Sequence, residues 1–330
     1  ALTGAEAERL FDAIAALKAA GAAVLYVSHR MDEILTISDR VYVMSDGRNV
    51  ATRDKDNVDV DELYELMVGK QRVNRADRKP RKAHFGAEPA LTLKNVTVPG
   101  EIEDISLKLA PGEILGLIGV QGSGAETILR TIFGIADEWQ GEIEYFGAPL
   151  TIDSPAQAVA KGIGYLPAER KTEGMIRNTS VSENVAITYG WQHGRGAGLI
   201  SRGKERGMIE GWVRKLAIKT PSIGHRIDNL SGGNQQKVVL SKWLFGKTLK
   251  VLMLDHPTRG LDPGARADLF AVIRELADQG LAILLVGDTL DEVLTLSDEI
   301  IVMKDGRVSA RIEGVQAAPP SEEELVKAMV

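Results

Sequence analysis

Hydrophobic and polar residues alternate along this chain with two different periods. In residues 5–20 and 264–279 the apolar positions recur every three or four residues, which predicts amphipathic helices. Shorter apolar runs, among them Val24–Val27 and Ile283–Val286, predict buried strands. Because strands that alternate with helices build a parallel sheet with helices on its faces, this pattern predicts an α/β fold.

The chain also contains an internal repeat. Residues 1–48, laid on residues 260–307 without a gap, are identical to them at 20 of 48 positions. Each copy contains a helix, a strand, a second helix that opens at an Asp-Glu pair, and a second strand that ends at an Asp-Gly turn. We interpret the two segments as duplicated copies of one structural unit.

The two copies differ in what precedes them. Residues 90–259 come before the second copy, whereas nothing in this sequence comes before the first. A lobe of residues 1–70 alone would leave strand edges and apolar faces uncovered. We therefore expect residues 1–70 to be the C-terminal remnant of a truncated domain. Residues 90–312 are predicted to form a complete second domain, followed by a tail helix in residues 313–330.

A basic segment, residues 71–89, joins the two predicted domains. It contains six Arg and Lys residues but one aromatic residue, Phe85, so it offers no stacking platform for nucleic acid and is interpreted as a solvated linker. The net charge of −6 gives no bulk attraction to nucleic acid or anionic lipid. The absence of cysteine excludes disulfides and thiolate metal sites. Apolar runs such as Leu281–Val286 are too short to cross a bilayer.

A glycine-rich loop lies between a predicted buried strand at residues 113–118 and a predicted helix that runs to Phe133. A phosphate-binding loop requires this order, because glycines let backbone amides converge on phosphate oxygens and the helix N-terminus adds positive potential. The spacing fits G-x-x-G-x-G-K-[S/T] and not the dinucleotide fingerprint. The predicted nucleotide-binding residues are Gly119, Gly122, Ser123, Gly124, Ala125, Glu126 and Thr127.

Two positions of this loop depart from the pattern. Ala125 stands where the phosphate-binding lysine belongs, and Glu126 stands where a hydroxyl would bind Mg²⁺. Loss of the lysine removes roughly 4 kcal/mol of attraction at 4 Å and an effective dielectric constant of about 20. The Glu126 carboxylate would repel a triphosphate. The loop therefore predicts nucleotide-binding ancestry and weak binding, and the alternative is a glycine-rich turn that only packs a helix on a strand.

A second glycine motif precedes another predicted helix, which runs to Phe245. Ser231 can cap this helix, while the glycines allow a ligand to approach its first amides. An apolar strand, Val251–Asp255, follows and ends in a carboxylate, which is the place for a weak Mg²⁺ ligand. The residues of the glycine motif are Leu230, Ser231, Gly232, Gly233, Asn234 and Gln235.

In this order, the phosphate loop, the LSGG-x-Q motif and the strand ending at Asp255 resemble the ABC ATPase family. The forms LSGGNQQK, YLPAERK (165–171) and DHPTRGLD (255–262) resemble the C-terminal cassette of the fused, two-cassette ATPases of bacterial sugar importers of the ribose, xylose or galactose type. The resemblance implies a P-loop NTPase cassette with a parallel core sheet, an antiparallel β subdomain (91–118, 141–152) and an α-helical subdomain at about 170–229.

Measured against that family, the second cassette departs at several further positions. Ala168, beside Glu169, stands where many cassettes have the Q-loop glutamine. His256 replaces the glutamate expected to polarise water, and Asp288 replaces the switch histidine, whereas its counterpart in the first copy, His29, is retained. His256 could act as a base instead, but degeneration is the interpretation that we favour.

The resemblance implies a division of labour between two cassettes that pair head to tail. The second would supply Ser231, Gly232 and Gly233 to ATP held by the first, whose site includes His29 as a contact to the γ-phosphate. His29, Asp255 and His256 are therefore the candidate catalytic residues. ATP and Mg²⁺ are the implied cofactors. The implied partners are membrane permease subunits, with a sugar-binding protein indirectly and no nucleic acid, and the implied location is peripheral, on the cytoplasmic face of the membrane.

Two other functions stay open at this point. The chain could be a non-catalytic, regulatory pseudo-ATPase module, since it holds no complete hydrolytic site. It could also belong to a tandem ABC protein that acts on ribosomes or DNA, although such proteins resemble two competent sites joined by a long charged linker.

Overall fold

The computed structural model describes residues 4–28, 31–45, 48–68, 88–136, 138–188, 202–245 and 248–330. The chain divides into two compact units, which we call the N-terminal unit (residues 1–74 with 262–267) and the main unit (residues 75–261 with 268–330). His29, the first Asp-Gly turn and most of the predicted linker lie outside the described residues.

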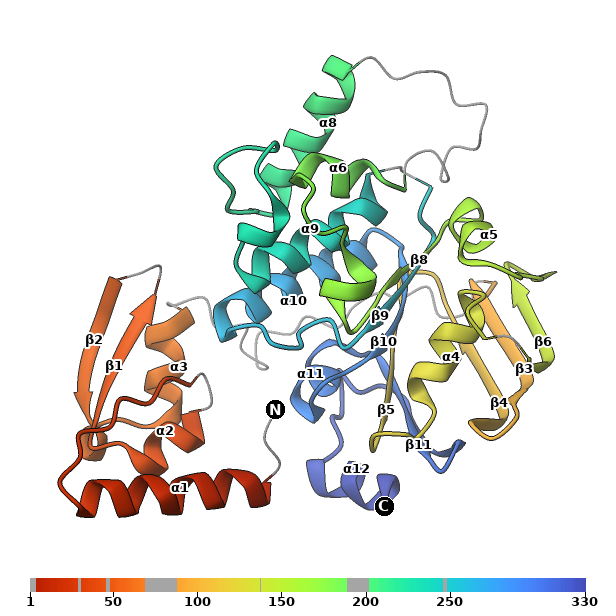
Figure 1. The fold of residues 1–330 in the computed structure, drawn as a ribbon. Helices are drawn as coiled ribbons and strands as arrows, with labels where there is room; N and C mark the ends of the chain where they lie inside the picture. The colour runs from red at the N-terminus through yellow and green to blue at the C-terminus, as the bar shows by residue number, and fades with distance from the viewer. Residues whose placement is uncertain are drawn as a thin grey trace. The chain divides into compact units, whose positions relative to one another are not determined.

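The N-terminal unit is a small α/β layer. β1 and β2 pair antiparallel, and the side chains of Met31, Val41, Val43 and Leu63 form a core between them and the helices. The elements are α1 (Gly4–Ala19), α2 (Met31–Ile37), β1 (Arg40–Ser45), β2 (Arg48–Asp54), η1 (Lys55–Asn57) and α3 (Val60–Val68) (Figure 1).

The strand predicted at Val24–Val27 does not form, and this expectation was wrong. Residues 22–28 have no regular secondary structure, and Leu25 and Val27 are 91% and 88% exposed. The sheet of this unit is the β1-β2 hairpin alone within the described residues, so no strand offers residues 24–27 a ladder of hydrogen bonds. The apolar pattern is present, but the partner that would make it a strand is not.

The main unit is built on a six-stranded sheet in the order β12-β11-β5-β10-β9-β8. Neighbouring strands are parallel except for β12, which pairs antiparallel with β11. All residues of β8, β9 and β10 are buried, as expected for parallel strands covered on both faces. The strands are β5 (Ile114–Gly119), β8 (Ile163–Leu166), β9 (Val251–Asp255), β10 (Ala282–Val286), β11 (Glu299–Lys304) and β12 (Arg307–Ile312).

A second, antiparallel sheet in the order β4-β3-β6-β7 lies beside this core. It comprises β3 (Leu91–Val98), β4 (Ile102–Leu109), β6 (Gln140–Tyr145) and β7 (Ala148–Pro149). The antiparallel region that we predicted to reach residue 118 is therefore shorter. Ile114–Gly119 pairs with two parallel neighbours, because its residues are apolar on both faces and can be buried only in the middle of the core sheet.

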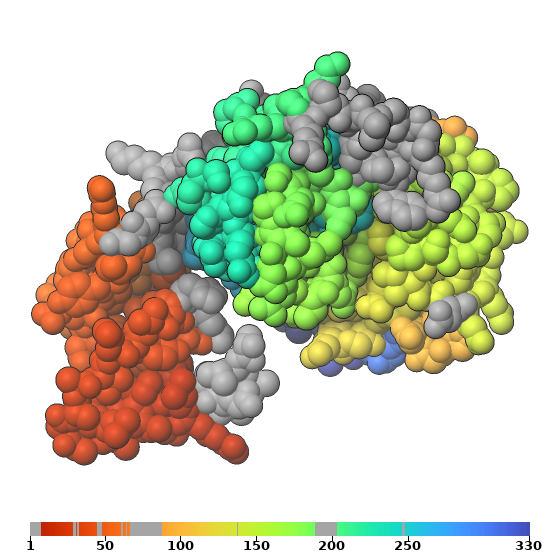
Figure 2. Space-filling view, turned by 45° about the horizontal axis from the view of Figure 1, so that its top comes forward, coloured from red at the N-terminus to blue at the C-terminus, as the bar shows by residue number. Residues whose placement is uncertain are grey.

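Helices cover the core sheet and form one separate layer. α4 packs on β5, β9 and β10, α11 on β5, and α12 on β11. In the helical layer, α6 packs on α8 and α9, and the green and teal residues of this layer form a continuous surface in Figure 2. The remaining elements are α4 (Ala125–Ile132), α5 (Pro155–Ala160), η3 (Arg170–Gly174), α6 (Val181–Ala186), α8 (Arg202–Lys215), η4 (Ile227–Asn229), α9 (Gly232–Leu244), α10 (Pro263–Asp278), α11 (Leu290–Leu296) and α12 (Glu322–Met329).

The strand register places the candidate chemistry at one edge of the core sheet. Val286 is the register partner of both Leu117 and Asp255, so β5, β10 and β9 end side by side. The loops that follow these strands therefore leave the sheet together, and this carboxyl edge is where α/β sheets bind ligands. Among the helices of the described residues, none combines the length and hydropathy needed to cross a membrane.

Glu113 gives a test of how this core is held. Its side chain is 3% exposed, and its Oε2 accepts a hydrogen bond from the Ala110 amide at 2.6 Å. Burial, assisted by the negative charges of Glu299 and Asp298, raises the pKa of Glu113 from 4.5 to about 7. The protonated form thus stabilises the folded state fully below pH 4.5, and this stability is lost as the pH rises through 7.

We predict that Glu113→Gln leaves the unfolding free energy unchanged near pH 4.5 and raises it at pH 8, by up to about 3 kcal/mol. Urea unfolding followed by tryptophan fluorescence measures this, because all four tryptophans lie in the main unit. Glu138→Gln, the same change at an exposed glutamate of the main unit, serves as the matched control. An equal stability of the Glu113→Gln protein and the parent chain at pH 8 would contradict the assignment.

Candidate nucleotide-binding site

The glycine loop has the wound form that its spacing predicts. The backbone of Gly122 and Gly124 is left-handed, with φ of 84° and 92°, and the Ser123 amide donates to the Val120 carbonyl at 2.9 Å. At Gly119 a Cβ atom would lie 2.3 Å from Ser123 Oγ, so a larger residue cannot replace this glycine without a shift. Glycine is therefore needed at these positions both for conformation and for space.

The side chains that follow the loop do not offer charge or hydroxyl to a phosphate. Ala125 is buried and carries only a methyl group. Thr127 is also buried, and its hydroxyl donates to Glu101 Oε2 at 2.6 Å. Glu126 projects its carboxylate beside His256, with Oε1 3.8 Å from Nε2 of the ring. The structure thus places the seven predicted residues from the end of β5, through the loop, to the first turn of α4, without a cationic side chain among them.

Asp255, the carboxylate that ends β9, is held by two side chains of its own chain. Its Oδ2 accepts a hydrogen bond from the Tyr165 hydroxyl at 2.6 Å, and its Oδ1 lies 2.6 Å from His256 Nδ1. The side chain of Asp255 is 7% exposed and that of His256 is 12% exposed. Both carboxylate oxygens are therefore bonded inside the protein.

His256 lies between two carboxylates, Asp255 and Glu126. Its backbone is left-handed, with φ of 46°, and its amide donates to the Val286 carbonyl at 2.9 Å. Burial lowers the pKa of His256, but the hydrogen bond and charge of Asp255, with a contribution from Glu126, outweigh both burial and the positive charge of Arg259. The pKa of His256 is therefore raised above its ordinary value, so the imidazolium persists to higher pH than in a free histidine.

These residues do not fit a tightly bound Mg²⁺. The hydroxyl that would bind the metal is absent at Glu126, and both oxygens of Asp255 are engaged by Tyr165 and His256. Nowhere in the described part of the chain do three or more His, Asp or Glu residues cluster in a way that could hold a metal ion. The Mg²⁺ expected at Asp255 therefore has no suitable ligand set here.

The position of the switch histidine carries Asp288 in a rigid setting. Its amide donates to Glu292 Oε2 at 2.8 Å, and its Oδ1 accepts from Arg259 Nε at 3.3 Å. The repeat uses the same anchor in the N-terminal unit, where Ser28 Oγ donates to Glu33 Oε2 at 3.0 Å. Glu33 and Glu292 are equivalent in the repeat, so the same carboxylate fixes both loops.

The LSGGNQ motif forms the first turn of α9, with Ser231 at the N-cap position. The expected capping bond is not made, because Ser231 Oγ accepts from Asn234 Nδ2 at 2.8 Å instead. Within the described residues, the amides of Gly232, Gly233 and Asn234 therefore have no hydrogen-bond partner, and the first intrahelical bond comes from the Gln235 amide. The turn presents three backbone donors and the positive end of a helix.

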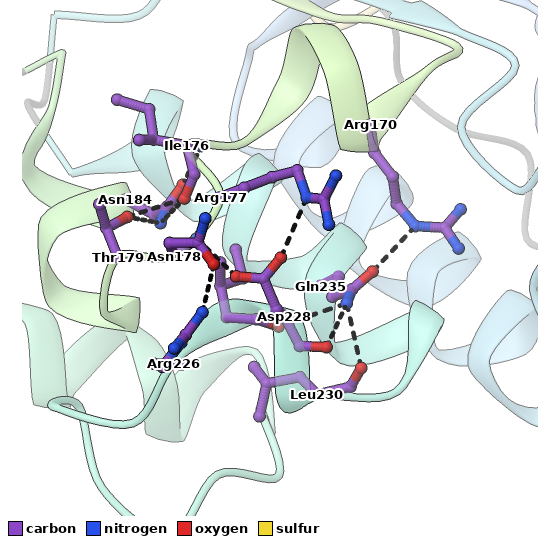
Figure 3. Close-up of polar contacts among 11 residues, drawn as sticks. Arg170, Ile176, Arg177, Asn178, Thr179, Asn184, Arg226, Asp228, Leu230 and Gln235 are labelled. Atoms are coloured by element: carbon purple, nitrogen blue, oxygen red, sulfur yellow. Dashed lines mark hydrogen bonds and ion pairs between the residues drawn. The ribbon is translucent and has the colours of Figure 1, made fainter.

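Gln235 fixes the loop that leads into this turn. Its Nε2 donates to the carbonyls of Leu230 at 3.1 Å, Ile227 at 3.3 Å and Asp228 at 3.4 Å, as Figure 3 shows in part. Asp228 is itself bonded by the Asn178 amide and by Arg177 Nε, and both bonds lower its pKa. The turn is thus preorganised before any ligand is present.

The predicted residues fall into two separate groups. Asp255, His256 and Glu126 converge at the carboxyl edge of the core sheet, whereas the LSGGNQ residues cluster with Arg170, and no hydrogen bond or ion pair joins the two groups across the described residues. Sequence analysis gave no role to Tyr165 or Arg170, although both lie in the YLPAERK segment. The available signal was their place in the YLPAERK segment, which served there only as a family resemblance.

Comparison with known proteins identifies the scaffold. Residues 102–259 match the family model described as ABC transporter. The chain is 39% identical over 317 residues to the ribose import ATP-binding protein RbsA of Bacillus subtilis, covering 96% of this chain and 63% of that protein. It is 41% identical over 309 residues to RbsA 2 of Rubrobacter xylanophilus, covering 94% and 59%. The chain therefore spans about three fifths of the length of these relatives.

Solved structures agree on the fold. An ATP-binding cassette of an ABC transporter in its ADP conformation superposes with a TM-score of 0.60 at 22% identity, covering 73% of this chain and 98% of that one. A component of an ABC transporter complex from Clostridium perfringens gives a TM-score of 0.60 at 21% identity, covering 73% and 94%. The main unit thus has the fold of an ABC ATPase cassette, its residues 102–259 match the ABC transporter family model, and the chain is homologous to the ribose import ATP-binding proteins of bacteria.

Proposed function

We propose that this chain is the C-terminal part of a two-cassette subunit that binds ATP and energises an ABC importer for a monosaccharide such as ribose. The observation that carries the proposal is an asymmetry between its two glycine motifs. The loop at Gly119–Thr127 has lost its cation, whereas the turn at Ser231–Gly233 keeps its backbone donors unbonded. The names of the relatives support the transported class.

In this proposal the main unit works on a nucleotide held by another cassette. Two cassettes pair head to tail, so that ATP bound by the first faces Ser231, Gly232 and Gly233 of the second. Amides and the Ser231 hydroxyl then donate to the γ-phosphate, where negative charge is stabilised during transfer to water. His29 belongs to the first cassette's site and positions the attacking water, while Mg²⁺ and ATP are bound there rather than at Gly119–Thr127.

The N-terminal unit is then the end of that first cassette. Its residues 24–27 correspond in the repeat to β10, which is buried between β5 and β9 in the main unit. The exposed side chains of Leu25 and Val27 therefore mark a surface that strands of the first cassette would cover. Residues 71–89 would link the two cassettes.

The remaining partners follow from the same scheme. A permease on the membrane would present a cytoplasmic helix to the helical layer, and a sugar-binding protein would act on the permease from the other side. A cavity of about 570 Å³ between the core sheet and the helical layer, walled by Phe133, Tyr165 and Trp243, supports this docking mode. The subunit would then sit peripherally on the cytoplasmic face of the membrane.

A regulatory pseudo-ATPase is the second candidate for the chain by itself. The closure of Asp255 by Tyr165 and His256 favours it, because the site is neutralised without metal or nucleotide. The two candidate functions differ in whether the turn at Ser231 is needed to hydrolyse ATP that is bound by the first cassette.

We predict that the chain alone does not turn over Mg·ATP and that turnover requires an intact first cassette joined ahead of residue 1. In the joined protein, Ser231→Arg and His29→Ala should each lower kcat by about a hundredfold or more, since each removes a group aimed at the γ-phosphate. Phosphate release measures this, and Ser222→Arg, at an exposed serine of the same layer, is the matched control. Hydrolysis by the chain alone at Gly119–Thr127 would rule the scheme out.

The weak nucleotide binding proposed for the loop at Gly119–Thr127 gives an independent prediction. The double change Ala125→Lys and Glu126→Ser should raise ATP affinity of the chain at least tenfold, because two charge changes near the phosphates contribute about 1–4 kcal/mol each. Polarisation of a fluorescent ATP analogue measures this. Ala125→Met with Glu126→Ser is the control of equal length and no charge. If the two double variants gain the same ATP affinity, the missing lysine charge is not the cause of weak binding by the loop.

A further inference from the structure

Arg170 lies against the first turn of α9 at Ser231–Asn234, which we call the signature turn. It does not belong to the glycine loop at Gly119–Thr127. Its Nη1 donates to the Arg259 carbonyl at 2.9 Å, and its Nε lies 3.4 Å from Gln235 Oε1. A Cβ atom at Gly232 would lie 2.8 Å from Nη2, and one at Gly260 would lie 3.8 Å from Nη1. The guanidinium thus fills the space beside two glycines, one in the signature turn and one in the loop after β9.

The other arginines of this region are occupied. Figure 3 shows Arg177 paired with Asp228 and Arg226 bonded to the Asn178 side chain. Arg259 forms ion pairs with two carboxylates, with 3.7 Å between Nη1 and Glu169 Oε1 and 3.3 Å between Nε and Asp288 Oδ1. No ion pair among the described residues includes Arg170.

The guanidinium of Arg170 therefore has N–H donors that no acceptor among the described residues uses. Of its five N–H donors two are used in hydrogen bonds, which leaves three. Arg170 is half-buried, and burial lowers the pKa of its guanidinium, although arginine stays protonated. A half-buried cation that keeps three N–H donors unused lies beside three unbonded amides, and the charge of the adjacent Glu169 offsets it only in part, so an anion is favoured at this place.

We propose that Arg170 is a further catalytic residue, which contacts the γ-phosphate of the nucleotide held by the facing cassette and acts together with Ser231, Gly232 and Gly233. This inference rests on the proposed function, because the nucleotide must be supplied in trans. Arg170 stabilises negative charge as the phosphoryl group is transferred to water, with the bond to ADP breaking and inorganic phosphate forming. Its bonds to Arg259 and Gln235 hold the guanidinium in place for this contact.

A purely structural role is the competing explanation, in which Arg170 only ties η3 to the loop after β9. The two roles differ in what they change. If Arg170 only joins these segments, its loss destabilises the signature turn and lowers both ATP affinity and kcat. A charge aimed at the transition state lowers kcat and leaves ATP affinity almost unchanged.

The test uses the protein with an intact first cassette. In Arg170→Gln, kcat should fall at least tenfold and KM should stay within about twofold, while Arg170→Lys retains an intermediate rate because the charge remains. Trapping of radiolabelled ADP with orthovanadate should fall at least tenfold in Arg170→Gln, whereas calorimetric affinity for a non-hydrolysable ATP analogue stays within about twofold. Arg206→Gln, which removes an exposed arginine paired with Glu210 on α8, is the matched control and should keep the parent kcat.

The outcomes separate this inference from the proposal on which it rests. If Ser231→Arg leaves turnover intact, the signature is not used in trans and the proposed function fails. If Ser231→Arg abolishes turnover while Arg170→Gln keeps the parent kcat and vanadate trapping, only the role of Arg170 is overturned. Equal losses of kcat and of analogue affinity in Arg170→Gln, with no rescue by Arg170→Lys, would show a structural tie and also overturn it.

Discussion

A carboxylate that is buried at the end of a parallel strand needs hydrogen-bond donors around it. In this protein, side chains of the same chain bond both oxygens of the Asp255 carboxylate. In the phosphate-loop architecture a metal ion and a nucleotide would share that task, but here the Tyr165 hydroxyl and the His256 ring take both oxygens. The His256 ring also lies 3.8 Å from Glu126 Oε1. The polar groups at this edge of the sheet are therefore bonded to one another within the chain.

The signature turn shows the opposite situation. Its amides are the donors that a helix N-terminus leaves unsatisfied, and Ser231 does not cap them because its hydroxyl is held by Asn234. Gln235 and Asp228 hold the turn by hydrogen bonds, and Arg170 adds a guanidinium that forms no ion pair among the described residues. The polar groups of one motif are bonded within the chain, whereas the amides of the other are unbonded, and the proposed action on a nucleotide in trans rests on this difference.

The internal repeat shows how far local sequence can direct folding. Residues 24–27 and 283–286 carry the same apolar pattern, yet the second segment is a fully buried strand and the first is exposed without regular structure. Each repeat nevertheless keeps its glutamate anchor, at Glu33 and Glu292. The hydrogen bonds of the glutamate are made in both copies, whereas a parallel strand forms only where a neighbouring strand supplies hydrogen-bond partners.

The sequence by itself determined the α/β class, the glycine loop, the signature helix and the strand that ends at Asp255, because each depends on periodicity or glycine spacing within a short window. It also revealed the lost lysine and hydroxyl. Tertiary structure alone decided that Tyr165, 90 residues away, seals Asp255, that Arg170 meets Gly232, and that residues 24–27 are not a strand. These contacts join segments far apart in the chain, and strand order, which no local pattern encodes, brings such segments together.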